Sequence, residues 1–325
     1  MSVVLAVGLT SCAGSPRAAT PLRAGVPTLS IPLDTTLATP SATVAVVAMG
    51  TLRQPDNTFW QLFTRPAGAT AWTLTPTPTA TSPTPSGSSF AALALVRAGG
   101  GEVLGGSGDI SAWTTLVRRS SLASSPAGRA CRAGRMTAVS LDAADEALVG
   151  STCAAPDAVG IFGDVDGTWR DVGPTLRGTA SVVLRLTSVA GSTDALVAVR
   201  GTAGGTSLVS LAGAPGGTWA RSAPLALGAG DRIVSTGVGQ GGGFVVVTST
   251  SGRLAADEES GPAGAWSRLP TPPPGTAAVA VSGPDRIDAL SVASVRFTDW
   301  GLAPAGDRWV KLGTVEVPIE FGSSS

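Results

Sequence analysis

The side chains of this chain that could do chemistry are mainly arginines near the ends of apolar, strand-like runs. Arg97, Arg185 and Arg232 occupy such positions, and Asp142 has a comparable place. Guanidinium groups hold carboxylates and phosphates through paired hydrogen bonds, so arginines gathered at one mouth of a channel would bind an anionic group. The sequence therefore predicts a candidate channel-mouth ligand site made of these four residues. The alternative is that they are ordinary charges at strand ends.

The composition removes several kinds of chemistry. The 325 residues include no His and no Tyr, so the chain has no histidine general base and no histidine metal ligand. A Ser or Cys nucleophile would lack that base, and no Gly-x-Ser-x-Gly turn joins an apolar strand to a helix. The 22 basic and 22 acidic residues leave no basic excess for nucleic acid. We expect no catalytic residues, no cofactor and no nucleic-acid partner.

A metal site is not expected either. Asp164 and Asp166, in the run Asp-Val-Asp-Gly, have the spacing of half a calcium loop. Calcium takes six or more oxygen ligands, and the remaining acidic ligands do not follow in the sequence. The favoured interpretation is a structural turn.

The cysteines point to an oxidising compartment. Cys131 and Cys153 lie 22 residues apart, and we expect them to form a disulfide. The alternative is two buried free thiols, because a zinc site with two Cys and no His would be incomplete.

The third cysteine lies in an apolar N-terminal segment. Val3–Leu9 is too short to span a bilayer, and the Leu-Thr-Ser-Cys run that ends at Cys12 resembles a bacterial lipobox. No Lys or Arg precedes the apolar run. We interpret residues 1–12 as a truncated lipoprotein signal segment; the alternative is that the resemblance is accidental and Cys12 is a free cysteine beside an apolar tail. The resemblance implies lipid on Cys12, which would hold the protein on the outer face of the bacterial cell membrane. Residues 13–40, rich in Ser, Thr, Ala and Pro, are interpreted as a tether.

Six of the eight tryptophans follow short Gly or Pro-Gly turns and recur every 41 to 56 residues. They are Trp72, Trp113, Trp169, Trp219, Trp266 and Trp309. Between the later turns the chain has runs typical of four short strands per period. Four antiparallel strands in 40–50 residues describe one blade of a β-propeller.

The repeat predicts an all-β fold, with a β-propeller over residues 41–321 and a tail at 322–325. Six Trp turns indicate six blades, with seven as the alternative, and a pair of two-sheet sandwiches is the competing fold. A Thr/Pro-rich stretch, Thr73–Ser89, and an Arg/Ser-rich loop, Arg118–Arg135, interrupt the early repeats. We expect Thr314–Phe321 to pair with Thr28–Leu33 and so close the ring.

One of these turns carries a family resemblance. The run from Gly163 to Trp169 (GDVDGTW) is similar to a shortened Asp-box, the hairpin between the third and fourth strands of a blade in sialidase-like propellers. The other turns keep less of the motif. An enzyme of this family uses an arginine cluster, an acid/base and a Tyr nucleophile, and this chain has no Tyr.

These observations lead to two hypotheses about function. The first is an exported, membrane-anchored lipoprotein whose propeller is a non-catalytic binding or scaffold module, with a protein or glycan partner in the cell envelope. The alternative is a sialidase-like carbohydrate-active enzyme or glycan-binding lectin.

Overall fold

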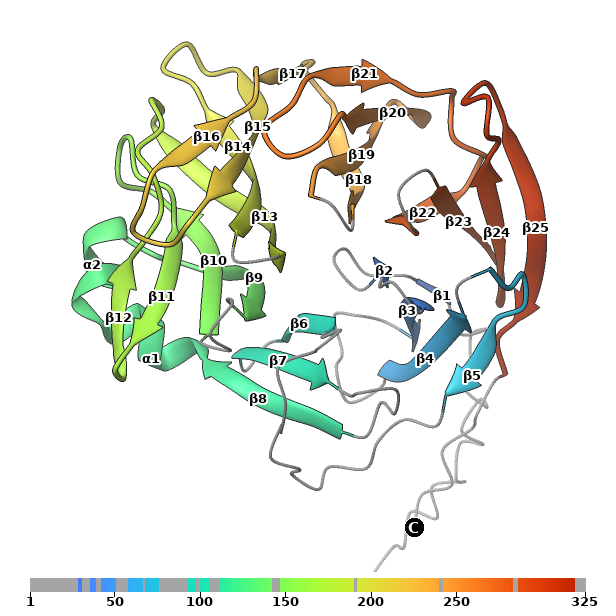
Figure 1. The fold of residues 1–325 in the computed structure, drawn as a ribbon, viewed down its shortest axis with the longest axis horizontal. Helices are drawn as coiled ribbons and strands as arrows, with labels where there is room; N and C mark the ends of the chain where they lie inside the picture. Colours follow the sequence, from blue (N-terminus) through green and yellow to red (C-terminus); the bar gives the residue numbers. More distant parts are fainter. Residues whose placement is uncertain are drawn as a thin grey trace, which may run out of the picture.

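The computed structural model describes residues 29–30, 36–38, 42–50, 58–66, 68–75, 93–97, 100–105, 112–141, 147–189, 192–239, 242–282 and 286–318. This part of the chain is almost entirely β-structure, in antiparallel sheets that surround a common centre (Figure 1). Sheets that lie side by side follow one another along the chain, except where the last sheet packs against the first. This is the arrangement of a β-propeller, as the repeat predicted.

One of the five hydrogen-bonded sheets is nine-stranded; we divide it where only two residue pairs join its halves and number the resulting six sheets in chain order. Sheet 1 contains β1 (Leu29–Ser30), β2 (Thr36–Ala38), β3 (Ala42–Gly50), β4 (Thr58–Pro66) and β5 (Thr73–Thr75). Sheet 2 contains β6 (Leu93–Arg97), β7 (Gly100–Gly105) and β8 (Ala112–Arg118). Sheet 3 contains β9 (Met136–Leu141), β10 (Ala147–Cys153), β11 (Ile161–Val165) and β12 (Thr168–Asp171).

Sheet 4 contains β13 (Ala180–Val189), β14 (Ser192–Arg200), β15 (Thr206–Gly213), β16 (Trp219–Arg221) and β17 (Leu225–Leu227). Sheet 5 contains β18 (Arg232–Val238), β19 (Phe244–Thr250), β20 (Arg253–Glu259) and β21 (Trp266–Arg268). Sheet 6 contains β22 (Thr276–Val281), β23 (Ile287–Ala293), β24 (Arg296–Leu302) and β25 (Trp309–Glu316). Sheets 3 and 4 touch edge to edge through β10 and β13, where Thr152 pairs with Val182 and Cys153 with Ser181.

The segment Arg118–Arg135 is not the loop that the sequence predicted. It folds into two short helices, α1 (Arg119–Ser124) and α2 (Pro126–Cys131). Ser125 caps α2, because its Oγ accepts a hydrogen bond from the Gly128 amide at 3.0 Å. Pro126 at the first helical position needs no amide partner, which favours a helix start there.

The predicted pairing of Thr314–Phe321 with Thr28–Leu33 is not seen among the described residues, and residues 28, 31–33 and 319–321 lie outside them. Leu29–Ser30 pair with β3, and residues 314–316 continue β25, which pairs with β24. Sheets 1 and 6 meet instead through side chains. Ala45, Val47 and Phe63 of sheet 1 pack against Leu290 and Phe297 of sheet 6. The Phe63 and Phe297 rings meet edge to face, with their centroids 5.3 Å apart.

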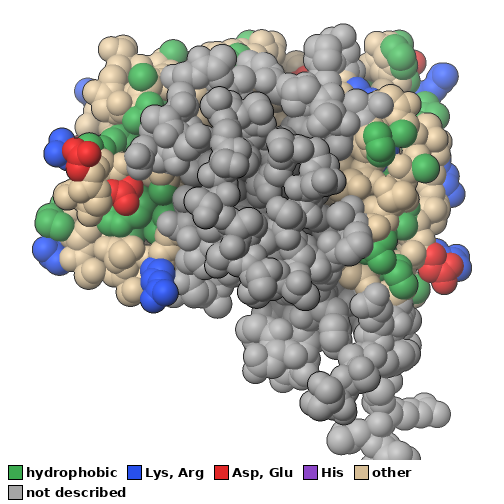
Figure 2. All heavy atoms as spheres, turned by 60° about the horizontal axis from the view of Figure 1, so that its bottom comes forward, with side chains coloured by type: hydrophobic (Ala, Val, Ile, Leu, Met, Phe, Trp, Pro, Cys, Tyr) green, Lys and Arg blue, Asp and Glu red, His purple; other side chains and the backbone are tan. Residues whose placement is uncertain are grey.

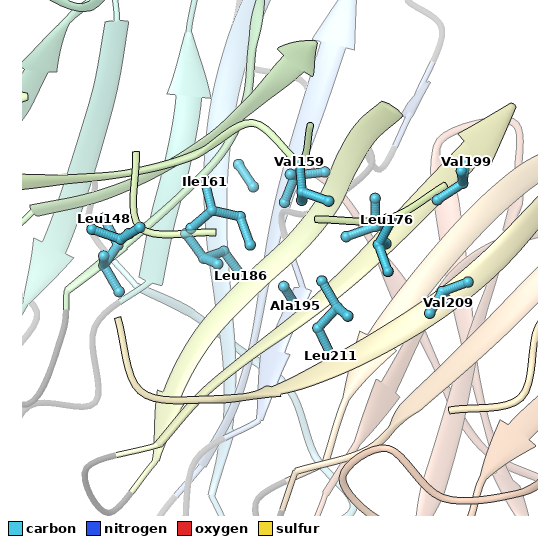
Figure 3. Packing of buried hydrophobic residues seen from close by; sticks show 13 residues of the cluster. Leu148, Val159, Ile161, Leu176, Leu186, Ala195, Val199, Val209 and Leu211 are labelled. Atoms are coloured by element: carbon cyan, nitrogen blue, oxygen red, sulfur yellow. The ribbon is translucent and has the colours of Figure 1, made fainter. Parts of the chain in front are cut away.

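The other described sheet interfaces are apolar in the same way. Leu148 and Ile161 of sheet 3 pack against Leu186, Ala195 and Leu211 of sheet 4 (Figure 3). Similar clusters join sheet 4 to sheet 5, sheet 5 to sheet 6, and sheet 2 with its helices to sheet 3. Because sheets 3, 4, 5 and 6 each have apolar clusters on both faces, burial between neighbouring sheets is the main stabilising contribution there.

The repeated tryptophans occupy equivalent places in these sheets. Three are the first residue of the outermost strand of their sheet, two are its second residue, and Trp72 directly precedes it. The side chains of Trp219, Trp266 and Trp309 are half-buried. Their Nε1 atoms donate to carbonyl oxygens just after the outermost strand of the preceding sheet, at Val172 (3.2 Å), Ala223 (3.1 Å) and Pro270 (3.1 Å). In these three repeats, the spacing of the tryptophans in the sequence therefore reflects one hydrogen bond that recurs between neighbouring sheets.

Candidate functional site

The four residues of the predicted ligand site have different surroundings. Arg185, on β13, is buried, and its Nε and Nη2 donate to Oγ1 (3.0 Å) and the carbonyl oxygen (2.6 Å) of Thr236 on β18. It therefore links sheet 4 to sheet 5. Arg232 is exposed at the start of β18, four residues before Thr236, which is about 13 Å along a strand.

The other two members give less information. Arg97 is the last residue of β6, and Asp142 lies outside the described residues. The four-residue site thus stays a prediction, whereas the structural use of Arg185 was not visible in the sequence. No spacing rule could have found it, because its partner lies on a strand 51 residues away.

Cys131 and Cys153 are joined by a disulfide, with their Cα atoms 5.2 Å apart. The bond ties the end of α2 to the end of β10, next to the edge where sheets 3 and 4 meet. Cys12 lies outside the described residues. No helix among the described residues has the length and apolar character needed to cross a bilayer.

The Asp-box-like run forms the two-residue hairpin turn between β11 and β12. Val165 pairs with Thr168, and Asp166 and Gly167 both have positive φ angles, 54° and 75°. This geometry suits a twisted antiparallel hairpin and favours Asp-Gly. Within the described ranges, no three His, Cys, Asp or Glu side chains are grouped closely enough to hold a metal ion among themselves.

A groove of about 990 Å³ lies where the segments after β12 and β16 meet sheet 4. Leu176, Val199 and Val209 form its apolar floor, which is the end of the cluster between sheets 3 and 4 (Figure 3). The exposed side chains of Arg177 and Arg221 line its rim. The groove therefore combines an apolar surface with two guanidinium groups and one carboxyl group, that of Asp157.

Local hydrogen bonds hold the groove wall in place. The Asp157 amide donates to the Gly178 carbonyl at 3.0 Å, and the Gly178 amide donates to Asp157 Oδ1 at 2.9 Å. The Leu176 amide donates to the Asp157 carbonyl at 2.9 Å. Arg177 is thereby carried on a fixed segment. Such backbone anchoring favours a preformed binding surface.

The sequence contained one signal for this groove. A basic residue follows the tryptophan by two positions in three repeats, as Arg221, Arg268 and Lys311. Only Arg221 lines the groove, and Arg268 Nε pairs with Asp257 Oδ1 at 3.1 Å. The repeat could locate the basic position but not the concave surface beside it. Elsewhere on the described surface that Figure 2 shows, acidic and basic side chains are interspersed.

A buried charged network lies between sheets 1 and 6. The Arg65 guanidinium, on β4, donates to both Asp288 (β23) and Asp299 (β24), and all three residues are at most 2% exposed. Trp72 Nε1 donates to Asp299 Oδ2 at 2.8 Å, and its ring centroid lies 5.1 Å from Arg65 Cζ. Arg286 Nε donates to Asp288 Oδ1 at 2.9 Å. Burial and the charge of Asp288 raise the pKa of Asp299, and Arg65 opposes that shift.

A second buried acidic group lies between sheets 4 and 5. Asp194 (β14) and Glu259 (β20) are 2% and 4% exposed. Ser210 Oγ, on β15, donates to Glu259 Oε1. Burial raises the pKa of Asp194 to about 6, and burial, aided by the charge of Asp194, raises the pKa of Glu259 to about 7. Two such inaccessible carboxyl groups are not placed to act on a bound substrate.

Comparisons with known proteins leave the family open. No family model matches the chain, and no curated protein does. Among solved structures, a puromycin hydrolase S511A mutant aligns over 90% of this chain and 54% of its own, at 12% identity and TM-score 0.42. Hadza microbial sialidase Hz136 aligns over 89% and 58%, at 9% identity and TM-score 0.40. Trypanosoma rangeli sialidase aligns over 90% and 49%, at 12% identity and TM-score 0.33. This chain spans about half the length of these structures, and at such scores the similarity carries no argument about activity.

Proposed function

We propose that the protein is a non-catalytic binding module, a closed six-bladed propeller whose groove beside Arg177 and Arg221 binds an anionic partner. The groove is the observation that carries the proposal, because an apolar floor with two guanidinium groups suits a ligand that bears a carboxylate. The partner would be an acidic glycan or protein of the cell envelope.

The blade count and the closure have their own support. The described strands form five hydrogen-bonded sheets, and dividing the nine-stranded one between β10 and β13 gives six, which equals the number of Trp turns. The apolar cluster and the Arg65 network both join the first sheet to the last. A ring closed by side-chain packing satisfies both observations.

The binding proposal is tested on an array of acidic and neutral envelope glycans and acidic peptides. The Arg177→Gln, Arg221→Gln double variant should lose most of the binding that the wild type shows. Arg268→Gln is the matched control, since Arg268 has the same place in sheet 5 and should leave binding unchanged. Binding that survives the double variant would contradict the proposal.

The same array addresses the enzymatic alternative. A sialidase-like enzyme would release sugar from its ligand, and a lectin would hold it unchanged. We expect retained, unmodified ligand. Release of product by the wild type and not by the double variant would overturn the non-catalytic proposal.

The membrane proposal depends on Cys12. We propose that this residue carries lipid and holds the binding module on the outer face of the bacterial cell membrane. In a bacterial host, metabolic labelling with a fatty-acid analogue should mark the wild type, and Cys12→Ser should remove the label and release the protein from the membrane fraction. Label that persists in the variant would contradict the anchor.

A further inference from the structure

Residue positions in sheets 4 and 6 can be compared because both sheets have the same irregularity in strand pairing. In sheets 4 and 6 the innermost strand has a register shift, between Val183 and Arg185 and between Thr276 and Ala278. Leu196 and Leu290 lie opposite the residue that follows each shift. The two sheets can therefore be aligned on these two leucines.

This alignment places the buried acidic residues at equivalent sites. Asp194 and Asp288 each lie two residues before the reference leucine. On the neighbouring third strand, Ser210 is opposite Leu196, and Asp299 is opposite Leu290. Each of these pairs faces the next sheet in the ring.

The next sheet supplies a third residue to each interface. Arg65 lies seven residues before Trp72, and Glu259 lies seven residues before Trp266. Both are near the end of a third strand and reach back to the preceding sheet, where Arg65 meets Asp288 and Glu259 meets Ser210. One interface thus has an arginine where the other has a second carboxyl group.

The carboxyl groups between sheets 4 and 5 are incompletely bonded. Asp194 Oδ1 and Glu259 Oε2 are inaccessible to solvent and have no hydrogen-bond partner. Ser210 Oγ already donates to Glu259 Oε1, and it accepts from the Ala263 amide at 3.2 Å. Among the described residues, this interface has no counterpart of Arg65, which supplies the positive charge between sheets 6 and 1. A buried carboxylate without a counter-charge is strongly disfavoured.

We propose that Asp194 and Glu259 bind a hard divalent cation of the calcium class between sheets 4 and 5. Asp194 Oδ1 and Glu259 Oε2 are the free carboxyl oxygens, and oxygen donors are the ligands that such a cation takes. Two carboxylates supply at most four oxygens, so a calcium-class ion there would also need backbone carbonyl groups and water.

The backbone beside Asp194 is shaped for a close approach. Gly242, in the hairpin between β18 and β19, has φ +84°, and a Cβ atom there would lie 2.4 Å from Asp194 Oδ2. Only glycine fits that position, and it brings the sheet 5 hairpin against the sheet 4 carboxyl group.

The test is thermal unfolding of chelator-treated protein at pH 7.5, with and without calcium chloride. At a hundredfold excess over Kd, calcium should raise the Tm of the wild type by roughly 5 °C. Glu259→Gln and Asp194→Asn should each remove most of that shift. Glu258→Gln, the neighbouring residue on β20, is the matched control and should retain it.

Calorimetric titration should give one calcium ion per chain in the wild type and no binding in Glu259→Gln. A wild type whose Tm does not respond to calcium would overturn the proposal, as would a full response in both Glu259→Gln and Asp194→Asn. If the carboxyl pair holds only a proton, Tm will depend on pH but not on calcium, which also contradicts the proposal. Neither result bears on the groove, so this inference and the proposed function can fail separately.

Discussion

The interface between sheets 6 and 1 and the interface between sheets 4 and 5 place buried acidic residues at the same positions but balance their charge differently. Arg65 donates to Asp288 and Asp299 in the first, whereas Glu259 faces Asp194 and Ser210 in the second. The first interface is neutralised within the chain. In the second, Ser210 and the backbone at Gly264 and Phe244 hydrogen-bond Glu259, but no Lys or Arg among the described residues lowers the pKa of Asp194 or Glu259, and burial favours their protonated forms. The repeat fixes where a polar residue can lie between sheets, and the residue type decides what that position does.

The largest expected effect is at Arg65. Arg65→Met leaves Asp288 and Asp299 buried without their shared counter-charge, which should lower the free energy of unfolding by about 3–5 kcal/mol. Chemical denaturation at pH 7 measures the change. A loss below about 1 kcal/mol would mean that the network does not hold sheets 1 and 6 together.

The interface between sheets 4 and 5 should respond to pH. Asp194 and Glu259 have raised pKa values in the folded protein, so their contribution to stability is complete below about pH 4 and is lost as pH rises through 6 to 7. In the presence of chelator, Tm should be roughly 5 °C lower at pH 8 than at pH 5 because of these two groups. The Asp194→Asn, Glu259→Gln double variant should show a flatter profile, and equal profiles would contradict this assignment.

Tryptophans with a neutral and with a charged partner should also differ; Trp219 lies between sheets 3 and 4, and Trp72 lies between sheets 6 and 1. Trp219→Phe keeps an aromatic ring but loses the hydrogen bond to the Val172 carbonyl, which should cost about 1 kcal/mol. Trp72→Phe loses a hydrogen bond to the buried Asp299 carboxyl group and should cost about 2–3 kcal/mol. Equal losses in denaturation experiments would show that the charged partner adds nothing.

The smallest effect is expected at an exposed ion pair. Arg296 and Glu316 pair at 3.2 Å with side chains 59% and 67% exposed. Arg296→Ala should change the free energy of unfolding by less than about 0.5 kcal/mol. It therefore serves as a control for the Arg65 variant, and a loss near that of Arg65→Met would remove the contrast between buried and exposed pairs.

The sequence predicted local structure well where a short pattern determines it. The strand-like runs predicted between the later Trp turns include β13 and β19, because alternating or continuous β-branched residues specify strands locally. The spacing of the tryptophans located the start of the outermost strands. Helices α1 and α2 were missed because the Ser-Pro capping signal at Ser125 was obscured by the Arg/Ser-rich composition.

Contacts between sheets could not be predicted in the same way. Arg65 lies more than 200 residues from both of its carboxyl partners, and no local pattern marks that distance. Arg185 is predicted to line the channel mouth from its place near the end of an apolar run, and nothing local in the sequence marks its hydrogen bond to Thr236 of the neighbouring sheet. The groove depends on how the segment after β12 lies against sheet 4, which is tertiary packing.

The central claim is that the first and last sheets are joined through buried charge, and a double-mutant cycle between Arg65 and Asp288 tests it most directly. The free energies of unfolding of the wild type, Arg65→Met, Asp288→Asn and the double variant would be compared. We expect a coupling energy of at least about 2 kcal/mol, because each single variant leaves its partner unpaired. A coupling below about 0.5 kcal/mol would contradict the claim, because residues that do not interact have additive effects.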